Sequence, residues 1–227
     1  MELTYKVKRS PRRRSLTITV ERDRAVIVHA PDDAPDEAIE QAVASKRQWI
    51  YEKLSHPQKY HGLPHPPGKE LVNGESALYL GRQYRIELVS ADMAKVELAQ
   101  RFLIPKQEAA KRADAMKEWY IGKANERIIP RVMQHARQLG VDVTRIRIVD
   151  NHYRWGSCTP TGNISLNWRL IKAPMFVIDY VIVHELAHLI EANHTPVFWN
   201  TVRAQAPTMD KARAWLKENG QMLEQTI

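Results

Sequence analysis

The chain has 227 residues, carries 34 Lys and Arg against 26 Asp and Glu, and contains a single cysteine, Cys158. This length allows one large domain or two small ones with a hydrophobic core, and a content of 44% hydrophobic and 26% charged residues excludes a disordered or fibrous protein. One cysteine excludes an intrachain disulfide, no apolar run reaches the roughly 18 residues of a membrane span, and the N-terminus lacks a signal-peptide layout, which together predict a cytoplasmic protein with no membrane partner.

The first 106 residues are predicted to be rich in β-strands. Residues 16–20 and 25–28 are apolar and β-branched on either side of a turn at 22–24, which predicts a hairpin. A helix is expected over 37–54, followed by a loop rich in Pro and Gly over 56–68. Short strands are then expected at 77–80, 84–89, 96–98 and 102–104.

Positive charge is concentrated at the N-terminus. Residues 1–30 carry eight Lys and Arg, including Arg12, Arg13 and Arg14, against three Asp and Glu. Such a patch can bind nucleic acid, with an affinity that falls as salt is added. It can also protect the edge of a sheet from pairing with other chains. The sequence leaves both interpretations open.

The composition changes after Pro105 and indicates a soft boundary near residue 106. Residues 107–139 follow the spacing of an amphipathic helix that ends at Gly140, and Pro130 is expected to kink or divide it. Strands are expected at 145–149 and 164–170. The predicted parts are therefore an N-terminal β-rich part, 1–106, and a second part, 107–227.

The helix expected over 174–192 is apolar on almost every face, so it is predicted to lie buried. His184, Glu185 and His188 are among its few polar residues. Two imidazoles four residues apart project from one face and can hold one metal ion, and zinc accepts neutral imidazole. A carboxylate beside the first imidazole is suited to take a proton from water and pass it to a leaving amine.

His194 completes a set of three imidazoles. Asn193 is expected to adopt the left-handed conformation that ends a helix, and Thr195-Pro196 to start the next helix, over 196–205. The break brings His194 toward the other two histidines. A third histidine at one fixed position lowers the chance frequency of the pattern to roughly one in a thousand chains. The sequence thus predicts Zn²⁺ held by His184, His188 and His194, with Glu185 as general base.

Other residues near this motif leave alternatives open. Glu191, which stands where the metzincin pattern has glycine, is a rival third ligand or a group that orients an imidazole. Cys158 is either a fourth ligand of a closed structural site or a buried small hydrophobe. Arg154 can hold a substrate carbonyl, or belong with Trp155 to a packed corner. His152 can assist as a proton donor, but it is interpreted as a surface loop residue.

The histidine motif is accompanied by a distinctive run, Arg154-Trp155-Gly156-Ser157-Cys158. The motif itself comprises the His184–His188 helix, Asn193-His194 and Phe198-Trp199. This combination resembles the YgjP-like metallopeptidases. These are related to the SprT-like zinc proteases and, more loosely, to the zincins. The resemblance is strongest over 145–220. It implies a zincin-type catalytic domain, three histidine ligands and Glu185 as base, and it names no substrate.

We therefore expect an α+β protein: a zincin-like catalytic domain, with a small sheet beside the metal helix, preceded by a β-rich N-terminal part. It is predicted to be a zinc peptidase acting on a protein or peptide that pairs with the free edge of strand 164–170. Two other functions fit the motif: a nucleic-acid-associated protein with a structural zinc site, and a zinc hydrolase of a non-peptide amide or ester.

Overall fold

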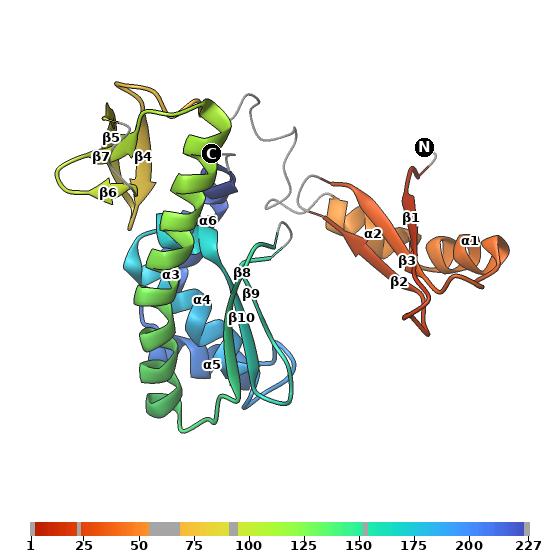
Figure 1. Ribbon diagram of the computed structural model, residues 1–227. Coiled ribbons are helices and arrows are strands. Elements are labelled where there is room, and N and C mark those ends of the chain that lie inside the picture. The colour runs from red at the N-terminus through yellow and green to blue at the C-terminus, as the bar shows by residue number, and fades with distance from the viewer. Residues whose placement is uncertain (1–2, 22–23, 55–68, 91–94, 152–153, 225–227) are drawn as a thin grey trace. The chain divides into compact units, whose positions relative to one another are not determined.

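The computed structural model describes residues 3–21, 24–54, 69–90, 95–151 and 154–224 (Figure 1). They form two compact units, Met1–Pro64 and His65–Ile227. The boundary expected near residue 106 instead lies inside the second unit. The reason is packing: Phe102 and Ile104, before that position, share one buried core with Met116 and Tyr120, after it. None of the described helices is both long and apolar enough to cross a membrane.

The first unit is a three-stranded sheet with two helices. Its elements are β1 (Lys6–Arg9), β2 (Thr17–Val20), β3 (Val26–Ala30), α1 (Asp36–Ser45) and α2 (Arg47–Leu54). The strand order is β1-β3-β2, and the antiparallel pairing of β2 with β3 confirms the predicted hairpin. The helix predicted over 37–54 is divided at Lys46. Alternate residues of β2 and β3 pack against Ile39, Val43 and Ile50 of the helices.

The second unit begins with a four-stranded sheet and a long helix. These elements are β4 (Ser76–Tyr79), β5 (Arg82–Val89), β6 (Glu97–Leu98), β7 (Phe102–Pro105) and α3 (Ala109–Leu139). The predicted strands are confirmed, in the order β4-β5-β7-β6. Pro130 lies inside α3 without dividing it, and Gly140 ends the helix with a positive φ, as predicted. At Gly81, where φ is +78°, an added Cβ would come within 2.5 Å of Pro174, so glycine is needed for this close approach.

A second, three-stranded sheet lies next to the remaining helices. The elements are β8 (Arg145–Val149), β9 (Gly156–Cys158), β10 (Asn163–Asn167), η1 (Trp168–Lys172), α4 (Met175–Ala187), α5 (Pro196–Gln205) and α6 (Met209–Glu224). Helix α4 contacts α3, α5, α6 and β9, which explains why nearly all of its surface is apolar (Figure 1). The α+β class predicted from the sequence is confirmed.

The strand expected over 164–170 differs from the structure in two respects. It ends at Asn167, whose side-chain oxygen accepts a hydrogen bond from the N–H of Arg169 and so caps η1. In addition, β10 is the central strand, paired with β8 on one side and β9 on the other. Strand β10 therefore has no free edge with which a substrate could pair. The two edge strands of this sheet are β8 and β9.

Candidate metal centre

Three histidines converge where α4 ends and α5 begins. Helix α4 carries His184 in its last turn and ends at Ala187, so that His188 is its capping residue. Thr195 then starts α5 by accepting a hydrogen bond from the N–H of Phe198, as predicted. Asn193 does not adopt the left-handed conformation expected of it; the chain turns without a positive φ there. The short connection nevertheless brings His194 back to the end of α4.

The geometry of the three imidazoles suits one metal ion. One ring nitrogen from each of His184, His188 and His194 lies within 4.8 Å of the others. The Nε2 atoms of His184 and His194 face each other at 3.2 Å. His188 Nδ1 lies 3.1 Å from the carbonyl oxygen of Ala192; donation there leaves the lone pair of Nε2 free. A set of three imidazole nitrogens with converging lone pairs fits a zinc ion.

Burial favours the neutral, metal-binding form of His184 and His194. Desolvation and then the charges of His188, His194 and Arg213 together lower the pKa of His184 to about 3. Burial and His188 also lower the pKa of His194. Nδ1 of His184 is buried and has no hydrogen-bond partner among the described groups.

Glu185 lies beside the histidines, on the side of α4 that faces β9. Its side chain is buried, and burial raises the pKa of its carboxyl to about 7, although Arg154 acts to lower it. Gly156 of β9 packs directly on this carboxylate: an added Cβ would lie 2.6 Å from Cγ and 2.7 Å from Oε1 of Glu185. Only glycine leaves room for Glu185 in this position.

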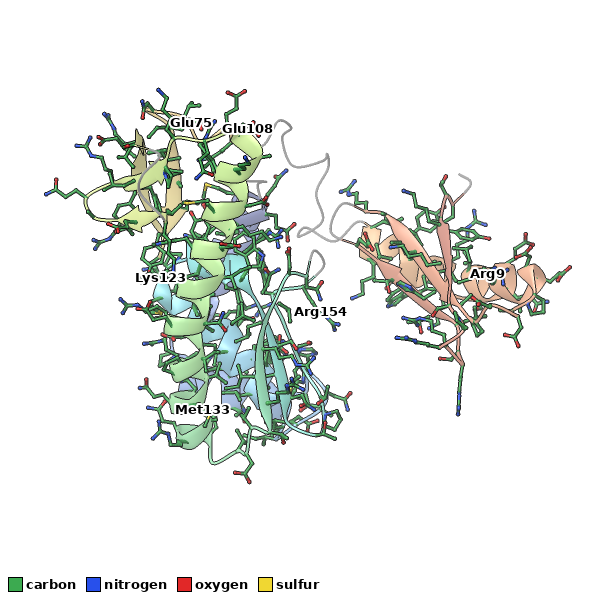
Figure 2. All side chains as sticks on the ribbon, in the orientation of Figure 1. Arg9, Glu75, Glu108, Lys123, Met133 and Arg154 are labelled. Atoms are coloured by element: carbon green, nitrogen blue, oxygen red, sulfur yellow. The ribbon has the colours of Figure 1, made fainter. Side chains whose placement is uncertain are left out.

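A pocket of about 370 Å³ opens next to Glu185 and His188. Its wall is formed by β9, the turn that follows it and the end of the α4–α5 connection. The lining residues are Arg154, Gly156, Ser157, Cys158, Thr159, Pro160, Glu185, His188 and Ala192. Arg154, labelled in Figure 2, is exposed. Its guanidinium makes no hydrogen bond or ion pair with the residues that the structure describes. The structure thus places a cation and a strand edge beside the histidines.

The structure separates the alternatives that the sequence left open near the motif. Glu191 Oε1 accepts the backbone N–H of Asn193 at 3.1 Å, and Glu191 is not part of the histidine group. Cys158 lines the pocket, outside that group; burial and then Glu185 raise the pKa of its thiol to about 11. His152 lies outside the described residues.

Aromatic side chains pack on the imidazoles. His188 lies 4.6 Å, centroid to centroid, from Phe198, and His194 stacks on Trp199 at 5.3 Å. The guanidinium of Arg213, on α6, lies over the ring of Trp199, 5.0 Å from its centroid. The sequence motif included Phe198 and Trp199, but nothing in the residues around Arg213 indicated that α6 packs so as to bring this side chain over Trp199.

A polar network holds α4 against α3 and α5. Asp179 of α4 accepts two hydrogen bonds from Arg131 at 2.5 Å, and its Oδ1 lies 3.3 Å from His135 Nε2. Gln205 of α5 bonds to His135 at 3.2 Å. Because Asp179 lies about one and a half turns before His184 on the same helix, this network fixes the helix that carries the histidines.

An α+β fold with converging imidazoles beside a buried carboxylate is the architecture of a metallopeptidase. The family model described as "YgjP-like, metallopeptidase domain" matches residues 14–219, and the chain belongs to this family, as its sequence motifs predicted. The match includes the hairpin of β2 and β3 as well as the histidine motif.

Two solved structures are similar to part of the chain. They are the metallopeptidase zymogens abylysin of Pyrococcus abyssi (21% identity, TM-score 0.34) and jannalysin of Methanocaldococcus jannaschii (20% identity, TM-score 0.35). Each similarity covers 40% of this chain, and 93% and 94% of the abylysin and jannalysin chains respectively. Among curated proteins none matches the chain.

Proposed function

We propose that the protein is a zinc-dependent peptidase in which His184, His188 and His194 hold the metal and Glu185 is the general base. The observation that carries the proposal is the convergence of three imidazole nitrogens within 4.8 Å beside a buried carboxylate and an open pocket. When bound, zinc would supply Lewis-acid chemistry, polarising a carbonyl and making water more acidic.

Glu185 has the properties that the proton transfers require. Its carboxylate reaches the pocket, and its burial raises the pKa to about 7, so the group can both accept and release a proton near neutral pH. It would take the proton from the attacking water and deliver it to the leaving amine. Gly156, which has no side chain, leaves room for the carboxylate to pack against β9.

The substrate strand is assigned to β9 rather than to the strand first expected. Gly156–Cys158 form the edge of the sheet and line the pocket, so an extended peptide can pair with their outward-facing backbone groups. In the antiparallel pairing of β9 with β10, the backbone N–H and C=O of Ser157 face Ser165, so the outward-facing groups are those of Gly156 and Cys158. Proline at Cys158 would remove one outward-facing N–H. We expect Cys158→Pro, but not Cys158→Ala, to raise KM for peptides, and unchanged kinetics in a folded Cys158→Pro variant would exclude pairing through this residue.

The arrangement favours an open site over a closed structural one. His194 is exposed, the pocket lies beside His188, and Cys158 stays outside the histidine group. A structural site of the kind considered from the sequence would need that fourth protein ligand. Hydrolysis of a non-peptide amide or ester would use the same residues, so substrate screens must include both kinds of bond.

The central experiment compares wild type with Glu185→Gln. The change keeps the three imidazoles, so zinc content and melting temperature should stay the same while hydrolysis falls by about 10²–10⁴-fold. Activity is read by mass spectrometry of new termini in a proteome-derived peptide library, with amide and ester dyes in parallel. Equal cleavage by the zinc-loaded variant would eliminate Glu185 as the base, and cleavage of the dyes alone would favour the non-peptide hydrolase.

A further inference from the structure

The sheet of the first unit has one apolar face and one basic face. Ile18, Val28 and Ala30 point into the core with α1 and α2. Neighbouring positions point the other way, and the register aligns them in two rows across the strands. One row is Lys8, His29 and Thr17; the other is Lys6 and Thr19 on either side of Ile27, whose side chain is buried beneath its neighbours. We refer to these two rows, with Arg13, as the basic face.

The cations of the basic face are close together. Lys6 and Lys8 are alternate residues of β1, which places them about 6.6 Å apart on one face. Arg13 donates a hydrogen bond to the hydroxyl of Thr17 at 3.4 Å, so the loop after β1 folds back toward the same row. Burial and then the charges of Arg13 and Lys8 lower the pKa of His29, which is consistent with both cations lying near it.

These charges are not neutralised within the described residues. Lys6, Lys8, Arg12, Arg13 and Arg14 are exposed, and the described chain gives them no ion pair. The acidic residues after the sheet instead gather over 32–40, where Arg9, on the apolar side of β1, pairs with Asp36. A rigid surface of unpaired like charges is unfavourable alone and becomes favourable when a polyanion releases its counterions on binding.

We propose that the basic face binds the phosphate backbone of nucleic acid. Lysines at strand spacing, with hydroxyl and imidazole groups between them, match a row of phosphates. The two rows carry no Asn, Gln, Phe, Tyr or Trp side chain, so the face lacks the amides that read base edges and the large rings that usually stack bases. Binding should therefore be independent of sequence and steeply dependent on salt.

A membrane surface fits the face less well. The large exposed apolar side chains of the first unit are Val7 and Trp49; Val7 aligns with core residue Val28, and Trp49 belongs to α2. Neither lies in the two rows. Without an apolar group to insert, attraction to lipid would be electrostatic alone and weak.

The test uses the full-length protein and fluorescein-labelled duplex and single-stranded DNA of unrelated sequences, with binding followed by anisotropy over a salt series. The variant is Lys6→Gln, Lys8→Gln and Arg13→Gln together. The control, Lys106→Gln, Lys111→Gln and Lys217→Gln, removes the same charge from exposed positions of the second unit. Circular dichroism and peptide hydrolysis show whether both remain folded.

Wild type and control should bind all DNA sequences alike, and the slope of log affinity against log salt should decrease by about 2–3 in the triple variant. No binding at low salt, equal losses in the variant and the control, or binding to phosphatidylserine vesicles but not to DNA would each overturn the proposal. Hydrolysis is a separate readout, so failure of this proposal leaves the proposed peptidase untouched, and the reverse also holds.

Discussion

In the first unit, Lys6 and Lys8 of β1 point outward from a small apolar core, whereas in the second unit His184 and Glu185 lie within an apolar helix. The outward charges gain little from folding, since water solvates them equally well in the unfolded chain. The inward groups lose solvation on folding and need partners or a ligand to compensate. Whether charged and polar side chains lie outside or inside the core thus distinguishes the proposed binding surface of the first unit from the proposed reaction centre of the second.

The largest effect expected from this comparison is on metal removal. If zinc binds the second unit alone, a chelator or His184→Ala should abolish hydrolysis and destabilise only that unit, by about 4 kcal/mol when free zinc is a thousand times the Kd. Hydrogen exchange followed separately in α4 and in β3 would measure this. Added zinc should restore the chelated wild type but not the variant. Equal loss of protection in both units would contradict the comparison.

The next effect concerns two glycines in the second unit. Gly156→Ala places a methyl group on the Glu185 carboxylate, whereas Gly122, on α3, has nothing within 4 Å of its added Cβ. Displacing the base by about 1 Å should lower kcat about 10²-fold. Zinc content should not change, and Gly122→Ala should keep full activity. If Gly156→Ala lowered zinc content and kcat in parallel, its role would be structural rather than positioning Glu185.

The hydrogen-bond network of Asp179 allows the stabilisation by buried polar groups to be measured away from the reaction centre. Asp179→Asn removes the charge that pairs with Arg131, and we expect a loss of about 2 kcal/mol at neutral pH. Exposed Asp114→Asn is the control. Urea unfolding of both variants would measure the difference.

The same variant has a predicted pH dependence. Burial acts to raise the pKa of Asp179, but hydrogen bonds from His135 and Arg131 outweigh it and hold the pKa below its usual value. A folded-state pKa below the unfolded one stabilises the protein above about pH 4, and this stabilisation is lost as pH falls further. The difference between wild type and Asp179→Asn should therefore shrink in acid. A gap that grew below pH 4 would reverse the assigned sign.

The convergence of the three histidines could be predicted from the sequence because it depends on residues that are close together along the chain. His184 and His188 need only helical spacing, and Thr195 with Pro196 marks the next helix start, so the convergence of His194 followed from neighbouring residues. Whether the three bind zinc stays a prediction. The conformation of Asn193 was wrong, yet the same corner formed, because the cap at Thr195 sets the direction of the chain.

Features that depend on distant segments were not predicted. The edge strand was assigned to 164–170, but strand order is decided by β8 and β9, which pair on both sides of β10. The contact between Gly156 and Glu185 joins a sheet edge to a helix, and no periodicity in either segment indicates it. The boundary near 106 followed a change in composition, whereas Phe102 and Tyr120 pack in one core across it.

The smallest effect is expected at Arg9 of the first unit, which connects β1 to the start of α1 (Figure 2). Its guanidinium donates to the carbonyl oxygens of Asp32 at 3.1 Å and Ala34 at 2.7 Å, and it pairs with Asp36 at 2.5 Å. These contacts are more numerous than the two hydrogen bonds of Arg131, but they are exposed, and the Asp36 side chain is 85% accessible.

Water can replace the partners of Arg9 when the side chain is removed, so Arg9→Ala should cost less than about 1 kcal/mol. Native-state hydrogen exchange in β1 and β3 would show this as a loss of protection smaller than about fivefold. Lys8→Ala is the control for the change in net charge, and high salt should reduce the effect of Arg9→Ala further. If Arg9→Ala destabilised the first unit as much as Asp179→Asn destabilises the second, burial would not explain the different stabilising energies of the two ion pairs. The metal centre would then be the remaining support for the contrast between exposed charges in the first unit and buried polar groups in the second.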